Sequence, residues 1–171
     1  MAGGTKVKNV DFARGLGQHK GVNTLTLSNR VIFTLAIVGF VVAGYVLKGY
    51  LTESSVFCPI GGGCDAVRKS PYAWPLGIPI PAFGFIGYTV ILVLAFLRTL
   101  KPENDHKLLT GMLGMAIFGT LFVTGFTLTE AFLIKEFCFW CVISTLIMYI
   151  IFGLTLTSFL KNRKSANVKR N

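Results

Sequence analysis

Residues 137–160 read FCFWCVISTLIMYIIFGLTLTSFL, an apolar run without a charged side chain that begins with a pair of cysteines. A helix needs about 20 such residues to cross a hydrocarbon core about 30 Å thick. Three more charge-free stretches precede this run, at residues 31–47, 71–97 and 108–129. The shortest is long enough if its helix continues to Leu51 while the Lys48 amine extends to the interface. The sequence therefore predicts an all-α membrane protein, a four-transmembrane-helix bundle, and a soluble protein with apolar core helices is the weaker interpretation.

The composition and the polar segments define three regions. Of the 171 residues, 53% are hydrophobic and 14% are charged, which is too apolar for a typical soluble domain. We expect transmembrane helices at about 31–51, 81–98, 108–133 and 137–160. They form one membrane domain over residues 31–160, flanked by a basic arm at residues 1–30, with a short surface helix near 10–16, and a basic tail at residues 161–171. Because thirty polar residues precede the first apolar stretch and no small-residue cleavage motif follows it, we expect a retained helix and not a cleaved signal peptide.

The basic residues predict how the chain is oriented. With the N terminus inside, thirteen of the 17 Lys and Arg lie on inner segments, and four lie outside: Lys48, Arg68, Lys69 and Lys135. Cytoplasmic segments of membrane proteins carry such an excess. The net charge of +10 therefore indicates topology and contact with anionic lipid, and not nucleic-acid binding. We expect a multi-pass protein of the cell (plasma or inner) membrane with both termini in the cytoplasm.

All four cysteines lie on the outer side in this topology, where disulfides persist. Cys138 and Cys141 form a C-x-x-C at the start of the last predicted helix, so they share one helical face. The free N–H groups and the dipole of a helix start favour a thiolate there. Cys58 and Cys64 lie in the first outer loop, residues 52–79, on either side of a segment with three glycines. Glycine lets that segment bend and lets a partner approach closely.

Two structural interpretations compete with redox chemistry. Two inert disulfides are possible in principle, although a disulfide within one helical turn constrains very little chain. A zinc site of all four cysteines is the other, and it would have to hold a flexible loop against a membrane helix. Both histidines, His19 and His106, lie on the inner side in this topology, so neither serves as an outer ligand or as the base of a cysteine hydrolase. We expect no metal.

The joint pattern resembles the vitamin K epoxide reductase family, and its prokaryotic members above all. The resemblance covers about residues 31–160 and rests on these elements: Cys58-x5-Cys64, Ser70, Gly77-Ile78-Pro79 and Cys138-x-x-Cys141. It implies that the C-x-x-C is the redox centre beside a quinone (ubiquinone, menaquinone or a vitamin K-type naphthoquinone). It also implies that the loop pair carries electrons from an outer thioredoxin-like protein. The DsbB-like family places its C-x-x-C in the first outer loop, so this order of motifs argues against it.

The resemblance implies a relay of thiol–disulfide exchanges. A reduced partner attacks the Cys58–Cys64 disulfide at Cys58, the freed Cys64 attacks Cys138, and Cys141, one turn deeper, reduces the quinone. Ser70 is expected near this centre, bonded to a quinone oxygen or to a cysteine sulfur. Its other interpretation is a helix cap before a proline, and the two roles are compatible. Three weaker candidates are Asp65, Trp74 and Trp140, of which the aromatic ones also suit interfacial anchors.

Three features depart from the family pattern. Many prokaryotic relatives continue into a thioredoxin-like domain, whereas here we expect a separate, DsbA-like partner on the outer side. Animal enzymes carry a tyrosine four residues after the second cysteine of the C-x-x-C, and here that residue is Thr145, which favours quinone over epoxide reduction. The arm at residues 1–30 has no counterpart in the family core, and we assign it no role.

The predicted function is that of a membrane oxidoreductase that forms disulfides in exported proteins. Electrons pass from the DsbA-like partner through Cys58/Cys64 and Cys138/Cys141 to a quinone dissolved in the membrane. The alternative within the same chemistry is a vitamin K epoxide or quinone reductase of the endoplasmic reticulum. A non-catalytic membrane scaffold with two structural disulfides is the alternative from another class.

Overall fold

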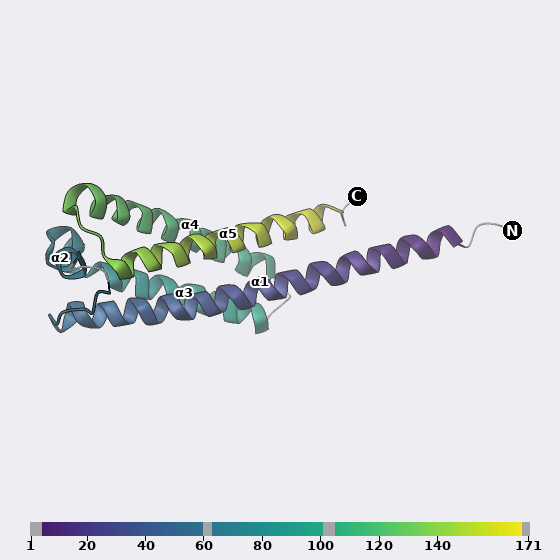
Figure 1. Ribbon diagram of the computed structural model, residues 1–171. Coiled ribbons are helices and arrows are strands. Elements are labelled where there is room, and N and C mark those ends of the chain that lie inside the picture. The colour runs from purple at the N-terminus through teal and green to yellow at the C-terminus, as the bar shows by residue number, and fades with distance from the viewer. Residues whose placement is uncertain (1–4, 60–62, 101–104, 169–171) are drawn as a thin grey trace.

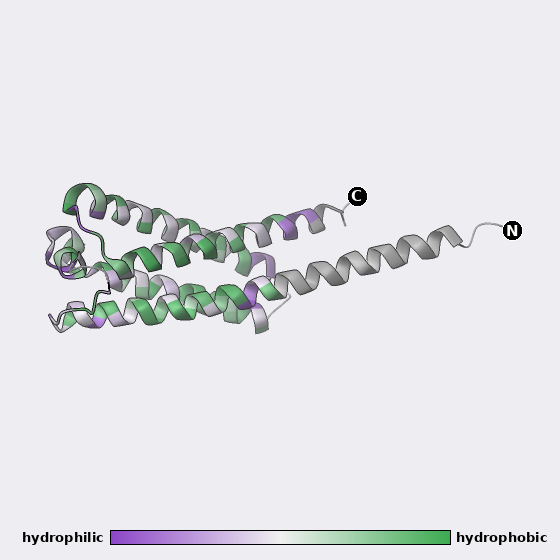
Figure 2. Ribbon diagram, in the orientation of Figure 1, coloured by the Kyte–Doolittle hydropathy of each residue, from purple (hydrophilic) through white to green (hydrophobic). Residues whose placement is uncertain are grey.

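The structure is a computed structural model that describes residues 5–59, 63–100 and 105–168, and these residues form helices and connecting loops without a strand. Four helical segments are long and apolar enough to cross a membrane: Leu27–Leu51, Ile80–Leu100, Asp105–Ile134 and Phe139–Lys164. Figure 2 shows the apolar residues along all four. The predicted all-α membrane bundle of four transmembrane helices is confirmed.

The first helix is much longer than predicted. α1 runs from Thr5 to Leu51, so it begins well before residue 31, and the short helix expected near 10–16 is part of it. The range from 5 to 51 contains no proline, and proline is the residue that interrupts a helix. Once the apolar turns have formed, each added residue gains one hydrogen bond without a new nucleation step. The polar residues before 31 therefore continue the helix.

The other three long helices agree with the prediction to within a few residues at most boundaries. They are α3 (Ile80–Leu100), α4 (Asp105–Thr129) and α5 (Phe139–Val168). α4 passes directly into a π-helical turn, η4 (Glu130–Ile134), which stops at Lys135 in the left-handed conformation. α1 packs along α3 and α5, and α4 also packs along α3 and α5, so the helices form a four-membered bundle (Figure 1).

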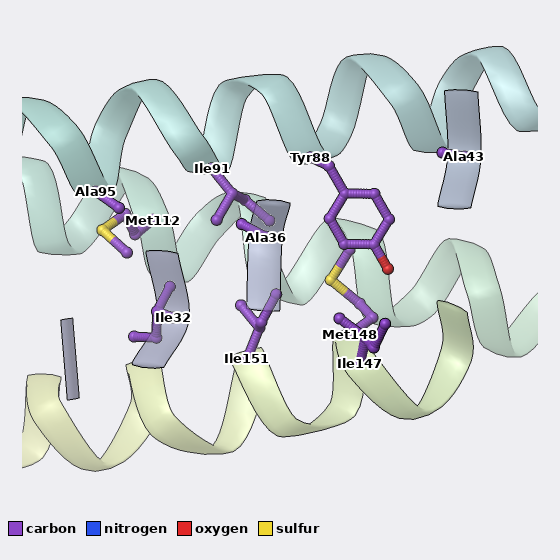
Figure 3. Close-up of a cluster of buried hydrophobic side chains, with 10 residues drawn as sticks. All are labelled: Ile32, Ala36, Ala43, Tyr88, Ile91, Ala95, Met112, Ile147, Met148 and Ile151. Atoms are coloured by element: carbon purple, nitrogen blue, oxygen red, sulfur yellow. The ribbon is translucent and has the colours of Figure 1, made fainter. Parts of the chain in front are cut away.

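Small residues let these helices approach closely. Figure 3 shows the central cluster of buried side chains, which is made of Ile32, Ala36, Ala43, Tyr88, Ile91, Ala95, Met112, Ile147, Met148 and Ile151. A Cβ atom at Gly39 would lie 2.4 Å from the ring of Tyr88, and one at Gly119 would lie 2.7 Å from Met148. Only glycine leaves room for these side chains between the backbones, as is common in membrane bundles.

Large apolar side chains also cover the outside of the bundle. Val41, Ile86 and Leu121 are 61%, 60% and 69% exposed. Soluble monomers rarely expose a continuous apolar surface of this extent. A surrounding lipid phase explains it, because lipid is as apolar as these side chains.

The first predicted outer loop contains three short helices that we did not predict. They are α2 (Gly63–Lys69), η1 (Pro71–Ala73) and η2 (Pro75–Gly77). α2 lies at the end of the bundle where α5 begins (Figure 1) and contacts both α5 and η4. A Cβ atom at Gly63 would lie 2.3 Å from the backbone oxygen of Phe137. Gly63 therefore serves close packing of α2 against the chain that leads into α5, and this role differs from the flexibility expected of the glycines.

Candidate redox site

The four cysteines meet at one end of the bundle, which we call the cysteine end. Cys58 and Cys64 form a disulfide with a Cα–Cα distance of 6.1 Å, whereas Cys138 and Cys141 are free thiols. Cys64 and Cys138 are 4% and 3% exposed and pack together with Val67. Cys58 and Cys141 lie against the same cluster. The loop pair and the C-x-x-C pair are therefore in contact, with Cys64 and Cys138 at the centre of that contact.

The start of α5 shapes the environment of Cys138. The Cys138 carbonyl accepts a hydrogen bond from the Val142 backbone N–H at 3.1 Å, which places Cys138 at the cap of the helix. A hydrogen bond from the Cys141 thiol lowers the pKa of Cys138, as do the backbone N–H groups of Cys141 and Trp140, while burial acts in the opposite direction. This lowering agrees with the thiolate expected at a helix start.

Behind the cysteines lies a cavity of about 170 Å³ that all four long helices line. Its walls are largely apolar, and Cys141 lines it together with Trp140, Ser144 and Thr145. An apolar cavity of about 150 Å³ holds a benzene molecule in another protein. The volume and the lining therefore suit one ring of a hydrophobic molecule, placed beside the Cys141 thiol.

Aromatic side chains line the cavity between α3 and α4. Phe122 lies with its ring centroid 5.6 Å from that of Phe83 and 6.5 Å from that of Phe118. Phe118 is 62% exposed on the apolar outside of the bundle, and Phe83 is 36% exposed. The cavity is therefore bordered by residues that also contact the lipid phase, which is the route that a lipid-soluble ring would use.

The polar groups of the cavity wall are bonded within the protein. The Tyr88 hydroxyl lies 3.0 Å from the Ser144 carbonyl and 2.9 Å from its Oγ. The Thr145 Oγ1 donates to the Cys141 carbonyl at 2.9 Å and lies 3.3 Å from the Thr127 Oγ1. Thr145 thus supports the first turn of α5.

Ser70 caps a helix, which was one of its two expected roles. Its Oγ accepts the Tyr72 N–H at 3.3 Å, and Pro71 follows at the first position of η1. Ser70 is half-buried and is not among the described residues that line the cavity. A role toward a quinone or a sulfur stays a prediction.

The three weaker candidates lie in different surroundings. Asp65 pairs with Arg68 at 3.4 Å in α2, and the Trp74 Nε1 donates to the Arg68 carbonyl at 3.0 Å. Trp140 alone reaches the cavity, and its Nε1 donates to the Phe57 carbonyl at 2.8 Å. Trp140 therefore links the loop before Cys58 to the start of α5.

Glu130 is the residue that the sequence interpretation did not single out. It is 0% exposed, and a carboxylate oxygen, the Cys138 Sγ and the Cys141 Sγ all lie within 4.8 Å of one another. Neither oxygen receives a hydrogen bond of normal geometry from a described residue, and the groups that face it are the Cys141 thiol and the Cys138 backbone. The sequence did contain a signal for Glu130, since it is an ionisable residue directly after the charge-free stretch 108–129. Ionisable residues within membrane segments are usually functional.

The same three groups are also potential metal ligands. Among the described residues, Glu130, Cys138 and Cys141 form a cluster of three donors, whereas structural zinc has four protein ligands. Oxidation of the two thiols to a disulfide would remove two of the three donors. Three protein ligands are also the number that catalytic zinc uses, so the absence of a metal stays a prediction.

Comparison with known proteins identifies a family and relatives among curated proteins. The sequence profile of the Vitamin K epoxide reductase family matches residues 30–156. The thiol-disulfide oxidoreductase LTO1 of Arabidopsis thaliana is 48% identical over 46 residues, which are 26% of this chain and 12% of that protein. The matched segment thus spans about an eighth of the length of this relative.

Proposed function

Since the chain belongs to the vitamin K epoxide reductase family, with a match over residues 30–156, we propose that it passes electrons from a thioredoxin-like protein to a membrane quinone. The coarser activity is that of a multi-pass membrane thiol-disulfide oxidoreductase, which the family and the similarity to a thiol-disulfide oxidoreductase support. The observation that carries the finer proposal is the position of Cys141, which contacts the other cysteines on one side and lines a ring-sized apolar cavity on the other.

The first step of the proposed relay takes place at the loop pair. Cys58 is half-buried in the loop after α1, whereas Cys64 is buried in α2. A thiolate of the partner attacks Cys58, the Cys58–Cys64 bond breaks, and Cys64 leaves as a thiolate. A second partner thiol then releases Cys58, so that two electrons enter the loop pair and the partner becomes a disulfide.

The second step transfers these electrons to the C-x-x-C pair. The packing of Cys64 against Cys138 supports attack of the Cys64 thiolate on an oxidised Cys138–Cys141 pair. Cys141 leaves as a thiolate, and attack of Cys58 on Cys64 then restores the loop disulfide. This structure has a loop disulfide beside two free thiols. In the proposed relay this is the state in which the loop pair is oxidised and the C-x-x-C pair is reduced by two electrons.

The residues of the cavity fit a quinone ring. A bound quinone would accept two electrons and two protons and leave as the quinol. The apolar wall would bind the ring and exclude water, and Trp140 and Thr145 hold the first turn of α5 so that the Cys141 thiol borders the cavity. The proposed quinone is a ubiquinone, a menaquinone or a vitamin K-type naphthoquinone. We include in the proposal an auxiliary role of Ser70 toward the quinone or a cysteine sulfur.

The basic residues support the proposed location. The end of the bundle opposite the cysteines is where α5 ends (Figure 1), and residues 161–171, which include the last turns of α5, are basic. The positive-inside rule places that end in the cytoplasm. The cysteine end then faces the outside of the cell membrane, where a separate DsbA-like protein delivers electrons from exported proteins.

The activity is tested with the full-length protein purified in detergent. A reduced DsbA-like protein and a soluble quinone are added, and quinol formation is followed by absorbance. We expect turnover by the wild type, loss of turnover in Cys141→Ala, and nearly unchanged turnover in the neighbouring control Val142→Ala, which is 38% exposed. No turnover by the wild type would favour the scaffold alternative, and turnover with vitamin K epoxide in place of quinone would favour the epoxide reductase.

A further inference from the structure

The carboxyl group of Glu130 is enclosed with the two thiols at the end of α4. It lies in η4, a π-helical turn, and such turns occur mostly as single turns within α-helices, frequently at functional sites. The carboxyl is 0% exposed, and both sulfurs are within 4.8 Å of it. An unpaired ionised carboxylate is costly to bury. A contribution to stability therefore does not explain why a glutamate is buried at this position.

The three acids cannot all be ionised at once. Three negative charges within 4.8 Å and without a cation would repel strongly in a medium of low dielectric constant. Protons are therefore shared between the carboxyl and the two sulfurs, and the three groups titrate together. The other titratable groups that act on this cluster are Tyr50 of α1 and, through Tyr50, Arg68 of α2.

Thiol–disulfide exchange needs a proton carrier at this place. The thiolate attacks and the thiolate leaves, but Cys138 is 3% exposed and Cys141 is half-buried beside a largely apolar cavity, so water has limited access to the pair. The side chain of His106 packs against Phe159 near the opposite end of the bundle, so it cannot serve. Glu130 is the one described carboxyl group that contacts the sulfurs.

We propose that Glu130 is the proton-transfer residue of the Cys138–Cys141 pair, an inference that rests on the proposed thiol chemistry and assigns a function to a residue outside the cysteine motifs. When the Cys64 thiolate attacks Cys138, the Cys64–Cys138 bond forms, the Cys138–Cys141 bond breaks, and Cys141 leaves with the electron pair. The protonated Glu130 carboxyl gives its proton to this sulfur. The products are a Cys141 thiol and a Glu130 carboxylate, and no electron passes through the carboxyl.

The same group acts in the opposite direction when the reduced pair is oxidised. Cys141 must then lose its proton before it can act as a nucleophile, and the Glu130 carboxylate accepts it. A Glu130 oxygen and the Cys141 sulfur lie within 4.8 Å of each other, and this short separation is the path for the transfer. Glu130 is thus reprotonated and is ready for the next exchange with Cys64.

The test follows the exchange step alone and requires neither quinone nor partner. Full-length protein with both pairs oxidised is mixed with excess dithiothreitol, and acid quenching with thiol alkylation and mass spectrometry measures how fast the Cys138–Cys141 bond opens. The ratio of the wild-type rate to that of Glu130→Gln is taken at each pH, since this ratio cancels the titration of the attacking thiol. We expect a ratio of about 100 near pH 6, in the range of general acid catalysis, and a ratio that falls toward one as rising pH removes the Glu130 proton.

Two further variants separate proton transfer from a structural effect. Glu130→Asp keeps a carboxyl on a side chain that is one methylene group shorter. We therefore expect a rate between those of the wild type and Glu130→Gln. The ratio of the Glu130→Asp rate to the Glu130→Gln rate should also fall toward one at high pH. Glu136→Gln changes an exposed acid on the same side, and its rate should equal that of the wild type. Thermal unfolding of all variants is measured in parallel, and Glu130→Gln should unfold at the wild-type temperature or above, because it removes an unpaired buried charge.

The outcomes distinguish this inference from the proposed function. A Glu130→Gln ratio near one at every pH, or a Glu130→Asp rate as low as that of Glu130→Gln, would overturn the role of Glu130 even if quinone turnover persists. Should quinone turnover be absent while the pH-dependent ratio is observed, the proton-transfer role would stand and the electron acceptor would have to be another molecule.

Discussion

The two ends of the bundle differ in whether a buried ionisable group has a partner of opposite charge. At the end opposite the cysteines, which we call the clasp end, Arg98 is 7% exposed and its Nε donates to the Asp105 Oδ1. The Asn162 Nδ2 donates to the other Asp105 oxygen at 2.8 Å, so this ion pair connects α3, α4 and α5. At the cysteine end, Glu130 is more deeply buried and is paired with no cation among the described residues.

The clasp end also includes α1. The Asn29 Nδ2 donates to the Ala95 carbonyl and to the Thr99 Oγ1, both at 3.1 Å. Polar groups in a membrane segment are expensive unless they are bonded to each other, and here they tie all four helices together. The Arg98 Nη1 and the Asn29 Oδ1 make no hydrogen bond with a described residue, so the ends differ in ion pairing and not in complete satisfaction. Arg98 has a carboxylate partner that stabilises the fold, whereas the Glu130 carboxyl has no cation among the described residues and needs a functional explanation.

The largest effect is expected from a change at the cysteine end that interrupts the relay. Cys141→Ala should reduce quinone-linked turnover to background, because no thiol remains to displace Cys64 from Cys138 or to line the cavity. We expect a Cys64–Cys138 disulfide to accumulate, because the Cys138 thiolate attacks Cys64 of the intact loop disulfide and Cys58 leaves as a thiolate. Non-reducing peptide mapping measures this cross-link, and a Cys58–Cys138 link in its place would reverse the assigned order of the loop cysteines.

The next effect concerns stability at the clasp end. Arg98→Ala leaves the Asp105 carboxylate without its cation, and we expect a loss of about 2–3 kcal/mol in the free energy of unfolding, less than for a fully buried pair because Asp105 is 30% exposed. Denaturation in detergent micelles measures this loss, while turnover per folded molecule should change little.

Arg68→Ala is the matched control at the cysteine end. The Arg68–Asp65 pair joins residues within one short helix at 3.4 Å, and such partly exposed pairs are worth about 0–1 kcal/mol. Equal stability losses in Arg68→Ala and Arg98→Ala would remove the structural distinction between the two ends.

A smaller effect is expected where α2 contacts the start of α5. A methyl group added in Gly63→Ala would clash with the Phe137 carbonyl, which is backbone and cannot move aside as a side chain does. We expect a cost of about 1–3 kcal/mol and slower electron transfer from the loop pair to Cys138, since α2 carries Cys64. Rapid mixing with thiol trapping measures this transfer. Gly125→Ala is the control, because no atom lies within 4 Å of its added Cβ, and an equally slow transfer in this control would contradict the explanation.

The smallest effect is a shift in the titration of Cys138. The hydrogen bond from Cys141 lowers the pKa of Cys138, so Cys141→Ala should move the midpoint of Cys138 alkylation to higher pH, and Cys141→Ser should restore part of the shift. Because the pKa is lower in the folded chain than in the unfolded chain, the thiolate adds stability above the unfolded pKa and this stability is lost as pH falls through the folded pKa. A midpoint in Cys141→Ala equal to that of the wild type would show that the Cys141 side chain is not the cause.

The features that could be predicted depend on residues close together in the sequence. Charge-free length defined the four membrane segments, and spacing grouped the cysteines as Cys58/Cys64 and Cys138/Cys141, because an x5 interval and a C-x-x-C each keep two sulfurs close along the chain. Which cysteines form the disulfide was not predicted. The early start of α1 at Thr5 was not predicted, since the polar residues before 31 carry no apolar period that would indicate a helix.

The features that could not be predicted depend on tertiary packing. The enclosure of Glu130 results from the fold bringing its carboxyl within 4.8 Å of the Cys138 and Cys141 sulfurs, and the sequence analysis did not single this residue out. Gly63 was interpreted as a source of flexibility in a run of three glycines, whereas its contact with Phe137 requires a missing side chain. Both contacts form across a change of chain direction, and the spacing of apolar residues in the sequence does not predict them.

The transfer of electrons from Cys138 and Cys141 to a quinone can be measured in a single turnover. Protein with an intact Cys58–Cys64 disulfide and a reduced C-x-x-C pair is mixed with quinone in the absence of any partner or reductant. We expect about one quinol per chain, with Cys138 and Cys141 converted to a disulfide and the loop pair unchanged. No quinol, or quinol formed while the C-x-x-C thiols stay reduced, would contradict the proposed electron path.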